Sequence, residues 1–443
     1  MTVHTRWYIW ASIMAVFIIG YFHRVAPAVL AEDLARTFRV SGVALGGLSS
    51  IYFYIYAFMQ IPSGICADTI GPRKTVTAGT AVMGLGSILF GLAPTLPLCF
   101  AGRFLVGLGV SVLMVNIMRI CVEWFRPDEM GIMNGLATAL GAIGGLLAAV
   151  PLAYLDHAIG WRTSFSVIGV LVLVLAWNCW RVVRDRPADC GLPGAGTCLA
   201  TDLVPEVPPQ RSIAAALVTV LTNRHTWPPF FGFFAIYSTL MAFTGLWGVP
   251  YLAQVYGLSN QQAASYVMVT SLGLVMGCPV VGWISDRLLL RRKLPYAVWT
   301  CIYLAVWAVL CLAGEGKPPL SWMYVLCFCM GFFSSGFILS IITAKELNPL
   351  DISGIAMGTC NTSGFLASAI LQVVLGKVLD LHWDGTLVNG VRVYPLDGFR
   401  AAFLVCLGLA VVAFIATLLL KETRCKNLRA HPTPRATGRD EIT

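Results

Sequence analysis

The sequence predicts an all-α polytopic membrane protein, with twelve transmembrane helices in two pseudo-symmetric six-helix bundles. First, 58% of its 443 residues are hydrophobic and 12% are charged, whereas soluble domains carry about 25% charged residues. Second, the apolar residues form blocks of about 20, the length that crosses a hydrocarbon core of about 30 Å. Third, landmark residues in the first half of the chain return in the second half.

The apolar blocks define twelve expected spans, separated by short polar segments. In order they cover residues 7–29, 45–65, 75–95, 99–121, 131–154, 163–181, 227–250, 263–285, 294–314, 320–343, 353–376 and 401–420. Residues 1–181 are then the N-terminal bundle, 182–226 a cytoplasmic linker, 227–420 the C-terminal bundle and 421–443 a disordered basic tail in the cytoplasm. Residues 212–222 of the linker are apolar, and we expect them to lie along the membrane surface or to lengthen the seventh helix.

The net charge of +9 follows the expected topology. With the N-terminus in the cytoplasm, about two thirds of the 30 Lys and Arg residues fall in cytoplasmic segments, as the positive-inside rule requires. The sequence therefore predicts that both termini are cytoplasmic, in the cell membrane or the inner membrane of a bacterium, and the basic charge does not imply a nucleic-acid partner. The 14 cysteines are spread singly through apolar spans, so we expect packing residues and no disulfide or metal site.

Two sets of landmarks recur at nearly the same offset between the halves. Gly64 and Asp68 follow the second span as Gly282 and Asp286 follow the eighth, and Gly131 and Gly135 open the fifth span as Gly354 and Gly358 open the eleventh. Such a repeat indicates a duplicated six-helix unit, in which a solute would bind between the two copies.

The segment GICADTIGPRK, residues 64–74, resembles the loop signature of the major facilitator superfamily, and Arg103-x3-Gly107-x-Gly109 resembles that family's second motif. The resemblance covers essentially the whole chain. It implies a secondary transporter that works by alternating access of a rocking two-bundle fold. No nucleotide-binding loop, catalytic triad or metal constellation occurs in the sequence, so we expect neither an enzyme nor a cofactor.

The charges of this loop predict a latch that holds the cytoplasmic side shut. Asp68 would meet the positive N-terminal end of a neighbouring helix, by family resemblance the eleventh, and Arg73 would meet Glu123 or the pair at 128 and 129. The predicted latch residues are Gly64, Asp68, Gly71, Arg73, Lys74, Arg119, Glu123, Gly282, Asp286 and Arg287. The alternative is that these charges only set the topology.

Three basic residues, Arg24, Arg103 and Arg119, fall inside expected spans, where a charge costs about 2.5 to 3.5 kcal/mol at a helix centre. Arg119 stands one turn from Glu123, which predicts an ion pair. Arg103 has a structural or coupling role by the resemblance. His23 is the only histidine well inside a span, and it is the expected proton-coupling residue because it titrates in the useful range.

Arg24, in GYFHRVAPAVL ahead of Pro27, resembles the first-helix arginine of the organophosphate and anion:cation symporter branches of the superfamily. A guanidinium that faces a cavity binds carboxylate or phosphate through two bonds; the alternative is an arginine that snorkels to the outer interface. The seventh span has no basic residue, so a monoanion or a zwitterion fits better than a doubly charged phosphate ester.

The remaining expected solute contacts are polar or aromatic residues on spans: Tyr52, Tyr56, Gln60, Asn116, Tyr237, Trp247, Tyr251 and Asn361. We predict a monomeric carrier that moves a small organic solute, foremost an organic anion, with a co-transported or exchanged ion. The alternatives are an exporter of hydrophobic compounds and a solute sensor on the same fold that does not transport.

Overall fold

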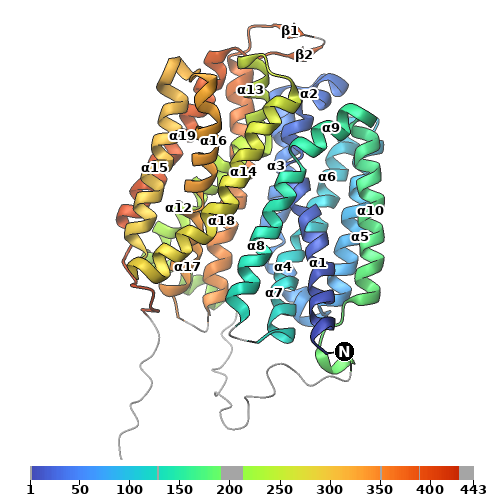
Figure 1. Ribbon diagram of the computed structural model, residues 1–443, viewed down its shortest axis with the longest axis vertical. Helices are drawn as coiled ribbons and strands as arrows, with labels where there is room; N and C mark the ends of the chain where they lie inside the picture. The colour runs from blue at the N-terminus through green and yellow to red at the C-terminus, as the bar shows by residue number, and fades with distance from the viewer. Residues whose placement is uncertain (1, 127–128, 191–212, 350–351, 389, 429–443) are drawn as a thin grey trace, which may run out of the picture.

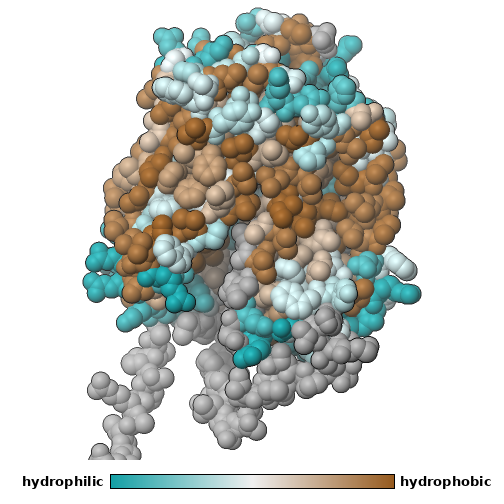
Figure 2. All heavy atoms as spheres, in the orientation of Figure 1, coloured by the Kyte–Doolittle hydropathy of each residue, from teal (hydrophilic) through white to brown (hydrophobic). Residues whose placement is uncertain are grey.

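The chain folds into a bundle of long helices with one short β-hairpin at one end (Figure 1). The computed structural model describes residues 2–126, 129–190, 213–349, 352–388 and 390–428. Hydrophobic side chains form a broad band around the middle of the molecule and hydrophilic ones gather at both ends (Figure 2). A folded surface of this kind requires a bilayer as its solvent.

Within the described residues, eleven helices are long and apolar enough to cross a membrane. They are Thr5–Val25, Pro72–Leu92, Leu96–Trp124, Ala139–Ile159, Trp161–Val182, Arg224–Tyr256, Asn260–Leu289, Lys293–Gly316, Leu320–Glu346, Ser353–Leu381 and Leu396–Leu419. The expected second span appears as the shorter helix α3 (Gly42–Phe58), followed after Met59 by α4 (Gln60–Thr69). The span is thus present but is divided at Met59.

The first half of the chain supplies ten helices, several of which are two pieces of one expected span. They are α1 (Thr2–Val25), α2 (Pro27–Phe38), α3, α4, α5 (Pro72–Leu92), α6 (Leu96–Ser111), α7 (Leu113–Trp124), α8 (Met130–Leu147), α9 (Val150–Ile159) and α10 (Trp161–Val182). The break between α1 and α2 falls at Ala26, directly before Pro27. Proline has no N–H to donate and its ring clashes with the preceding turn, which explains why the first span is divided there.

The second half has the same general plan. Its described elements are α11 (Ile213–Thr222), α12 (Trp227–Ala242), the π-helical turn η4 (Phe243–Trp247), α13 (Gly248–Tyr256), α14 (Asn260–Trp283), η5 (Ile284–Leu289), α15 (Lys293–Leu312), α16 (Leu320–Ser334), α17 (Phe337–Glu346), α18 (Ser353–Leu381), β1 (Leu387–Val388), β2 (Val391–Arg392) and α19 (Leu396–Leu419). Strands β1 and β2 pair antiparallel, with Val388 opposite Val391. The end of the bundle with this hairpin is called the hairpin end, and the end with the N-terminus the terminal end (Figure 1).

Two linker and tail segments differ from expectation. Helix α11 does not lengthen the seventh helix: Asn223 interrupts it with an extended backbone, and Ala216 and Val220 pack against Ile352 and Ala356 around the start of α18. The tail is not disordered from residue 421 onward, because Glu422 accepts hydrogen bonds from the backbone N–H groups that begin α15. The rest of the tail, from residue 429, lies outside the described residues.

The two halves touch along α3 and α18, which run antiparallel, and this seam is tight only toward the hairpin end. A Cβ on Gly46 would overlap the carbonyl of Gln372, and one on Gly42 would lie 2.9 Å from the carbonyl oxygen of Gly376. Ser50 Oγ donates to the carbonyl of Ala369 at 2.5 Å. Glycines at such positions let two helix backbones approach closely.

At the terminal end the same helices stand apart. A Cβ on Gly64, Gly354 or Gly358 meets no described atom within 4 Å, and the two halves separate toward this end (Figure 1). The structure is therefore closed at the hairpin end and open at the terminal end.

We expect Gly376→Val to destabilise this conformation, because its side chain would overlap the Gly42 backbone and overpacking costs about 1 to 3 kcal/mol. Thermal unfolding of the purified protein should begin several degrees lower. Gly408→Val, on α19 where a Cβ meets open space, is the matched control; equal melting temperatures for the two variants would show that the seam is not close-packed.

Candidate functional site

Arg24 lies where the two halves meet. Arg24 stands near the end of α1 and is 5% exposed. Its Nη1 donates to the Tyr237 hydroxyl of α12 at 2.9 Å. The side chain thus joins a helix of the first half to a helix of the second half. A snorkelling arginine would instead carry its charge to water, so this alternative is wrong.

Aromatic rings surround the guanidinium. Its central carbon lies 4.6 Å from the ring centroid of Tyr21, 5.0 Å from Phe365, 5.3 Å from Tyr56 and 5.8 Å from Tyr52. Tyr56 and Phe365 stack on each other across the seam with centroids 4.1 Å apart. We call Tyr21, Tyr52, Tyr56, Tyr237 and Phe365 the Arg24 cage.

The charge of Arg24 has no anionic partner in the part of the chain that the structure describes. None of the ion pairs there includes it, and its Nε has no hydrogen-bond partner. A desolvated cation is costly unless it is paired, and cation–π contacts return only about 0.5 to 2 kcal/mol. The cage therefore holds a cation that a bound anion would complete.

A second arginine, Arg103 on α6, lies on another side of Tyr52. It is 1% exposed, and its Nη1 donates to the main-chain carbonyl of His23 at 2.7 Å. Its central carbon is 5.5 Å from the Tyr52 ring, while Nε and Nη2 have no partner among the described residues. Tyr52 is thus in contact with both buried cations.

His23 is fully buried, and neither ring nitrogen has a hydrogen-bond partner in the described part of the chain. Its ring packs against Phe22 and Phe165 at centroid distances of 5.6 and 5.5 Å. A protonated imidazole here would place a second cation beside Arg103. The coupling roles of His23 and Arg103 stay predictions.

The other expected solute contacts divide into two groups. Tyr52, Tyr56 and Tyr237 belong to the Arg24 cage, Gln60 begins α4 one turn after Tyr56, and Asn361 is one turn before Phe365 on α18. Asn116, Trp247 and Tyr251 are placed elsewhere. Tyr21 and Phe365 were not among the expected contacts; Tyr21 stands three residues before Arg24, a spacing that shares a helix face and could have indicated it.

The three outlying residues have structural surroundings. Asn116 Nδ2 donates to the carbonyl of Val112, where α6 gives way to α7. Trp247 ends η4 and lines a cavity of about 370 Å³ at the hairpin end. Tyr251 donates to the carbonyl of Gly316 at 2.8 Å and packs on Phe403 inside the second half, so it is not part of the Arg24 cage.

Helix α12 and η4 explain part of this difference. A π-helical turn adds a residue to the turn and frees a backbone carbonyl; Gln372 Nε2 of α18 donates to the carbonyl of Met241, two residues before η4, at 2.8 Å. The added residue rotates the end of η4 and helix α13 relative to α12, so Trp247 and Tyr251 do not share the face of Tyr237.

The loop after α4 is anchored within the first half. Arg73 Nη2 donates to the carbonyl of Trp180 at 2.8 Å, its guanidinium lies over the Trp180 ring, and its backbone N–H donates to Asp185 at 2.6 Å. In this conformation Arg73 is therefore not paired with Glu123 or Glu129, whose partners are Arg119 and Arg6; the expected pairing in the closed state stays a prediction. Gly71 has φ +91° and a Cβ there would lie 2.9 Å from Asp185 Oδ2, so this turn requires glycine.

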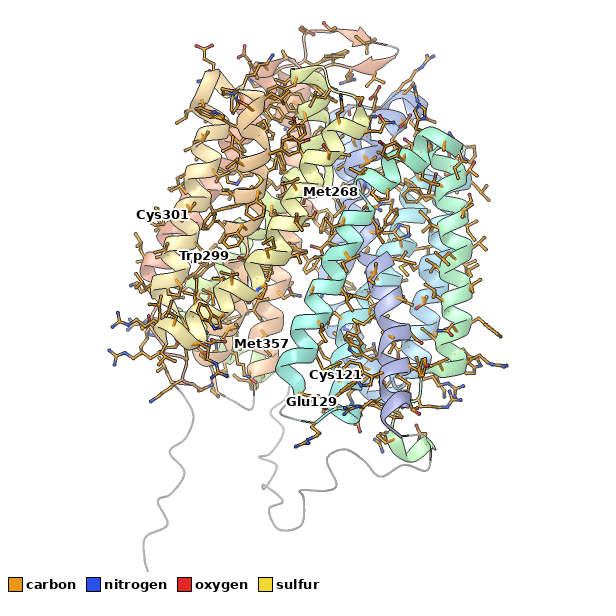
Figure 3. All side chains as sticks on the ribbon, in the orientation of Figure 1. Cys121, Glu129, Met268, Trp299, Cys301 and Met357 are labelled. Carbon is orange, nitrogen blue, oxygen red and sulfur yellow. The ribbon has the colours of Figure 1, made fainter. Side chains whose placement is uncertain are left out.

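The carboxylates that Arg73 was expected to meet have other partners. Arg119 and Glu123 form the ion pair that their spacing predicts, at 3.3 Å. Glu129, at the terminal end (Figure 3), accepts two bonds from Arg6, at 2.9 and 3.0 Å. Lys74 is exposed, and the Asp68 side chain and residue 128 lie outside what the structure describes.

The second copy of the motif makes its ion pairs inside the second half. Arg292 pairs with Asp286 and, at 2.8 Å, with Glu346. Arg287, which the sequence places in the predicted latch, is exposed. Thr423 of the tail also donates to Glu346. A Cβ on Gly282 would meet no described atom within 4 Å.

A bundle of membrane-crossing helices in two related halves, with a buried cation at their seam, defines a transporter fold. The sequence profile described as Major Facilitator Superfamily matches residues 12–372. The chain belongs to this family; it is a multi-pass membrane transporter and not an enzyme.

Relatives align over most of both chains. The "Probable hexose phosphate transport protein" of Chlamydia muridarum is 25% identical, covering 94% of this chain and 91% of its own. The "Probable galactarate/D-glucarate transporter GarP" of Escherichia coli is 26% identical, covering 86% and 90%. A solved bacterial homologue of the human lysosomal transporter Spinster, in an inward-facing and unoccupied conformation, superposes with a TM-score of 0.77 at 18% identity, covering 96% of this chain and 98% of its own, which shows the fold.

We expect Glu346→Gln to destabilise the protein strongly, because it leaves the buried Arg292 without its main partner and breaking a buried pair costs about 3 to 5 kcal/mol. Glu123→Gln, which breaks the partly exposed pair with Arg119, should cost less than about 1 kcal/mol. Thermal unfolding of both variants measures the difference. A Glu346→Gln protein as stable as Glu123→Gln would contradict the assigned network.

Proposed function

We propose that this protein carries a small organic anion across a bacterial inner membrane by alternating access, and that Arg24 anchors the anion. The single observation that carries the proposal is the guanidinium of Arg24, buried at the seam of the two halves without a carboxylate partner in the described residues. An anion there removes the cost of the unpaired charge.

The similarity to transporters named for hexose phosphate and for galactarate and glucarate supports an anionic cargo, because both names denote organic anions. The Arg24 guanidinium can donate to two carboxylate or phosphate oxygens at once. Phenols of Tyr56 and Tyr237 supply hydrogen-bonding groups for hydroxyls of the cargo, and the ring of Phe365 supplies an apolar wall. We expect a cargo with one carboxylate or phosphate at the anchor and a polyhydroxylated body.

The position of the site explains how binding is linked to movement. Arg24, Tyr21 and Tyr56 belong to the first half, and Tyr237 and Phe365 to the second. A solute that contacts both groups stabilises conformations in which the halves close around it, and a ligand shifts an equilibrium only by such differential contacts. The structure, open at the terminal end, is then the state that exchanges solute on that side.

We place the terminal end in the cytoplasm, because most of the described basic residues at the helix ends lie there. In the opposite state, Asp68 and the predicted latch would close the terminal end when Gly64 approaches Gly354 and Gly358. His23 and Arg103 are the residues through which a co-transported or exchanged ion would act on the cage.

We expect purified protein in proteoliposomes to show saturable counterflow of at least one of glucose 6-phosphate, galactarate, glucarate and gluconate, and none of uncharged glucose. Arg24→Ala should reduce the flux at least about 100-fold, because a lost charge-assisted pair in a buried site costs about 3 kcal/mol or more. Arg36→Ala, which removes a cation held in an exposed ion pair with Asp33, is the control and should retain flux.

Three results would contradict this proposal. Flux that survives Arg24→Ala removes the anchor. Thermal stabilisation by an anion without flux identifies a sensor. Absence of anion flux together with drug resistance conferred on an efflux-deficient host identifies an exporter of hydrophobic compounds.

We expect Tyr237→Phe to raise KM about tenfold or more with a smaller change in kcat, because it deletes the hydroxyl that positions Arg24 and a hydrogen bond to a charged group is worth about 1.5 to 3 kcal/mol. Tyr251→Phe makes the same chemical change away from the cage and should leave KM unchanged. Equal KM values for the two variants would separate Tyr237 from the solute site.

A further inference from the structure

Asp380, near the last turn of α18, reaches across the seam to the first turn of α3. Its Oδ1 accepts from the backbone N–H of Gly42 at 2.9 Å, and its Oδ2 from that of Val43 at 2.8 Å. These are the first two residues of α3, whose N–H groups have no partner within their own helix. The carboxylate also lies at the positive end of the helix dipole.

The remaining contacts of Asp380 come from its own half. Arg392 of β2 donates to Oδ1 at 3.1 Å and the Tyr394 hydroxyl donates to the same atom at 2.9 Å. The backbone N–H of Tyr394 in turn donates to Gln254 of α13 at 2.9 Å. The β-hairpin and α13 therefore hold the carboxylate in place, and α3 of the other half is what it binds.

The geometry ties these bonds to one conformation. A Cβ on Gly42 would lie 2.9 Å from the carbonyl of Gly376 and 2.8 Å from the Tyr394 hydroxyl, so the carboxylate reaches α3 only because the two backbones are in contact. Hydrogen bonds weaken steeply beyond about 3.2 Å. A separation of α3 from α18 by a few ångströms at this end breaks both.

The contact between Asp380 and α3 can also break reversibly. The Asp380 side chain is 16% exposed at the end of the bundle, and Arg392 and Tyr394 stay with it when α3 departs. The carboxylate then gains water and keeps two partners, which avoids the cost of a buried unpaired charge. It thus favours the closed hairpin end without locking it.

We propose that Asp380 is a gate residue of the transport cycle: its carboxylate on the N-terminus of α3 holds the hairpin end shut, and its release opens that end. The proposal rests on the alternating-access part of the proposed function. The two sides of the seam then carry equivalent aspartates. Asp380, near the end of α18, lies where α3 begins, and Asp68, near the end of α4, lies at the end of the bundle where α18 begins.

The test measures how often the hairpin end opens. Ser50→Cys places a thiol inside the closed seam, and a membrane-impermeant maleimide added outside intact cells labels it only when the seam parts. The chain without this reporter gives the background from the native cysteines. The rates are compared for the reporter alone, with Asp380→Asn and with Asp384→Asn.

Asp384 is the matched control because it is an exposed aspartate just after the end of α18, and its carboxylate accepts only from Thr386 in the described structure. Asp380→Asn should label about five times faster or more, as two charge-assisted bonds across the seam become at most one neutral bond. Asp380→Glu, which keeps the charge, should restore part of the difference. Asp384→Asn should label like the reporter alone.

A reporter at the terminal end distinguishes gating from local unfolding. Gly354→Cys faces open space there, and in inside-out vesicles its labelling should slow when Asp380→Asn shifts the population toward the opposite state. Faster labelling at both ends would indicate unfolding and overturn the proposal, as would equal rates for Asp380→Asn and Asp384→Asn. If Asp380→Asn does not reach the membrane, Tyr394→Phe is tested in its place. The Ser50→Cys reporter should then be labelled about twofold faster, because the lost hydrogen bond to Asp380 is worth about 1 kcal/mol or less. An unchanged labelling rate would overturn the proposal.

This outcome is independent of the cargo. If labelling responds to Asp380 but none of the four anions shows counterflow, the gate stands and the proposed cargo fails. If counterflow is present and labelling does not respond, the cargo stands and the gate fails.

Discussion

The structure depends on one unpaired charge at the place where its two halves meet. The guanidinium of Arg24 is withdrawn from water and held by aromatic faces and one phenol, none of which neutralises it. Such an arrangement is unfavourable as a static core, so the protein keeps a site that is incomplete by itself. Because the cage draws residues from both halves, whatever completes the site also joins the halves, which links recognition of the solute to the movement that carries it.

The seam itself is built from small residues and helix ends. Gly42, Gly46 and Gly376 allow backbone contact at the hairpin end, and Asp380 adds bonds whose donors would otherwise lack partners. At the terminal end the corresponding glycines face open space. The same pair of helices therefore contains both a closed and an open contact surface, and in the proposed transport cycle a rigid tilt of one half would exchange the two.

The fold followed from the sequence because the bilayer imposes a simple length and polarity rule, and the spans expected from apolar blocks match the observed helices within a few residues. Arg24 was predictable because a charge inside a span is rare. The partners of Arg73 and Arg292 were not, since loop charges have several candidates within reach and only the folded chain decides between Trp180, Asp185 and the carboxylates near α7. The position of Tyr251 outside the Arg24 cage was not predictable, because helical periodicity does not reveal the extra residue of η4.

The short segment after α19 has a practical meaning for work on this protein. Glu422 caps α15: burial opposes its ionisation, but the backbone N–H groups of Arg292, Arg424 and Lys293 lower its pKa on balance. The backbone N–H of Leu428 donates to the main-chain carbonyl of Glu346, and the Thr423 hydroxyl donates to the Glu346 carboxylate. A chain cut at the end of the last helix would lose this brace, so affinity tags and fluorescent fusions belong beyond residue 428, where they leave the second bundle intact.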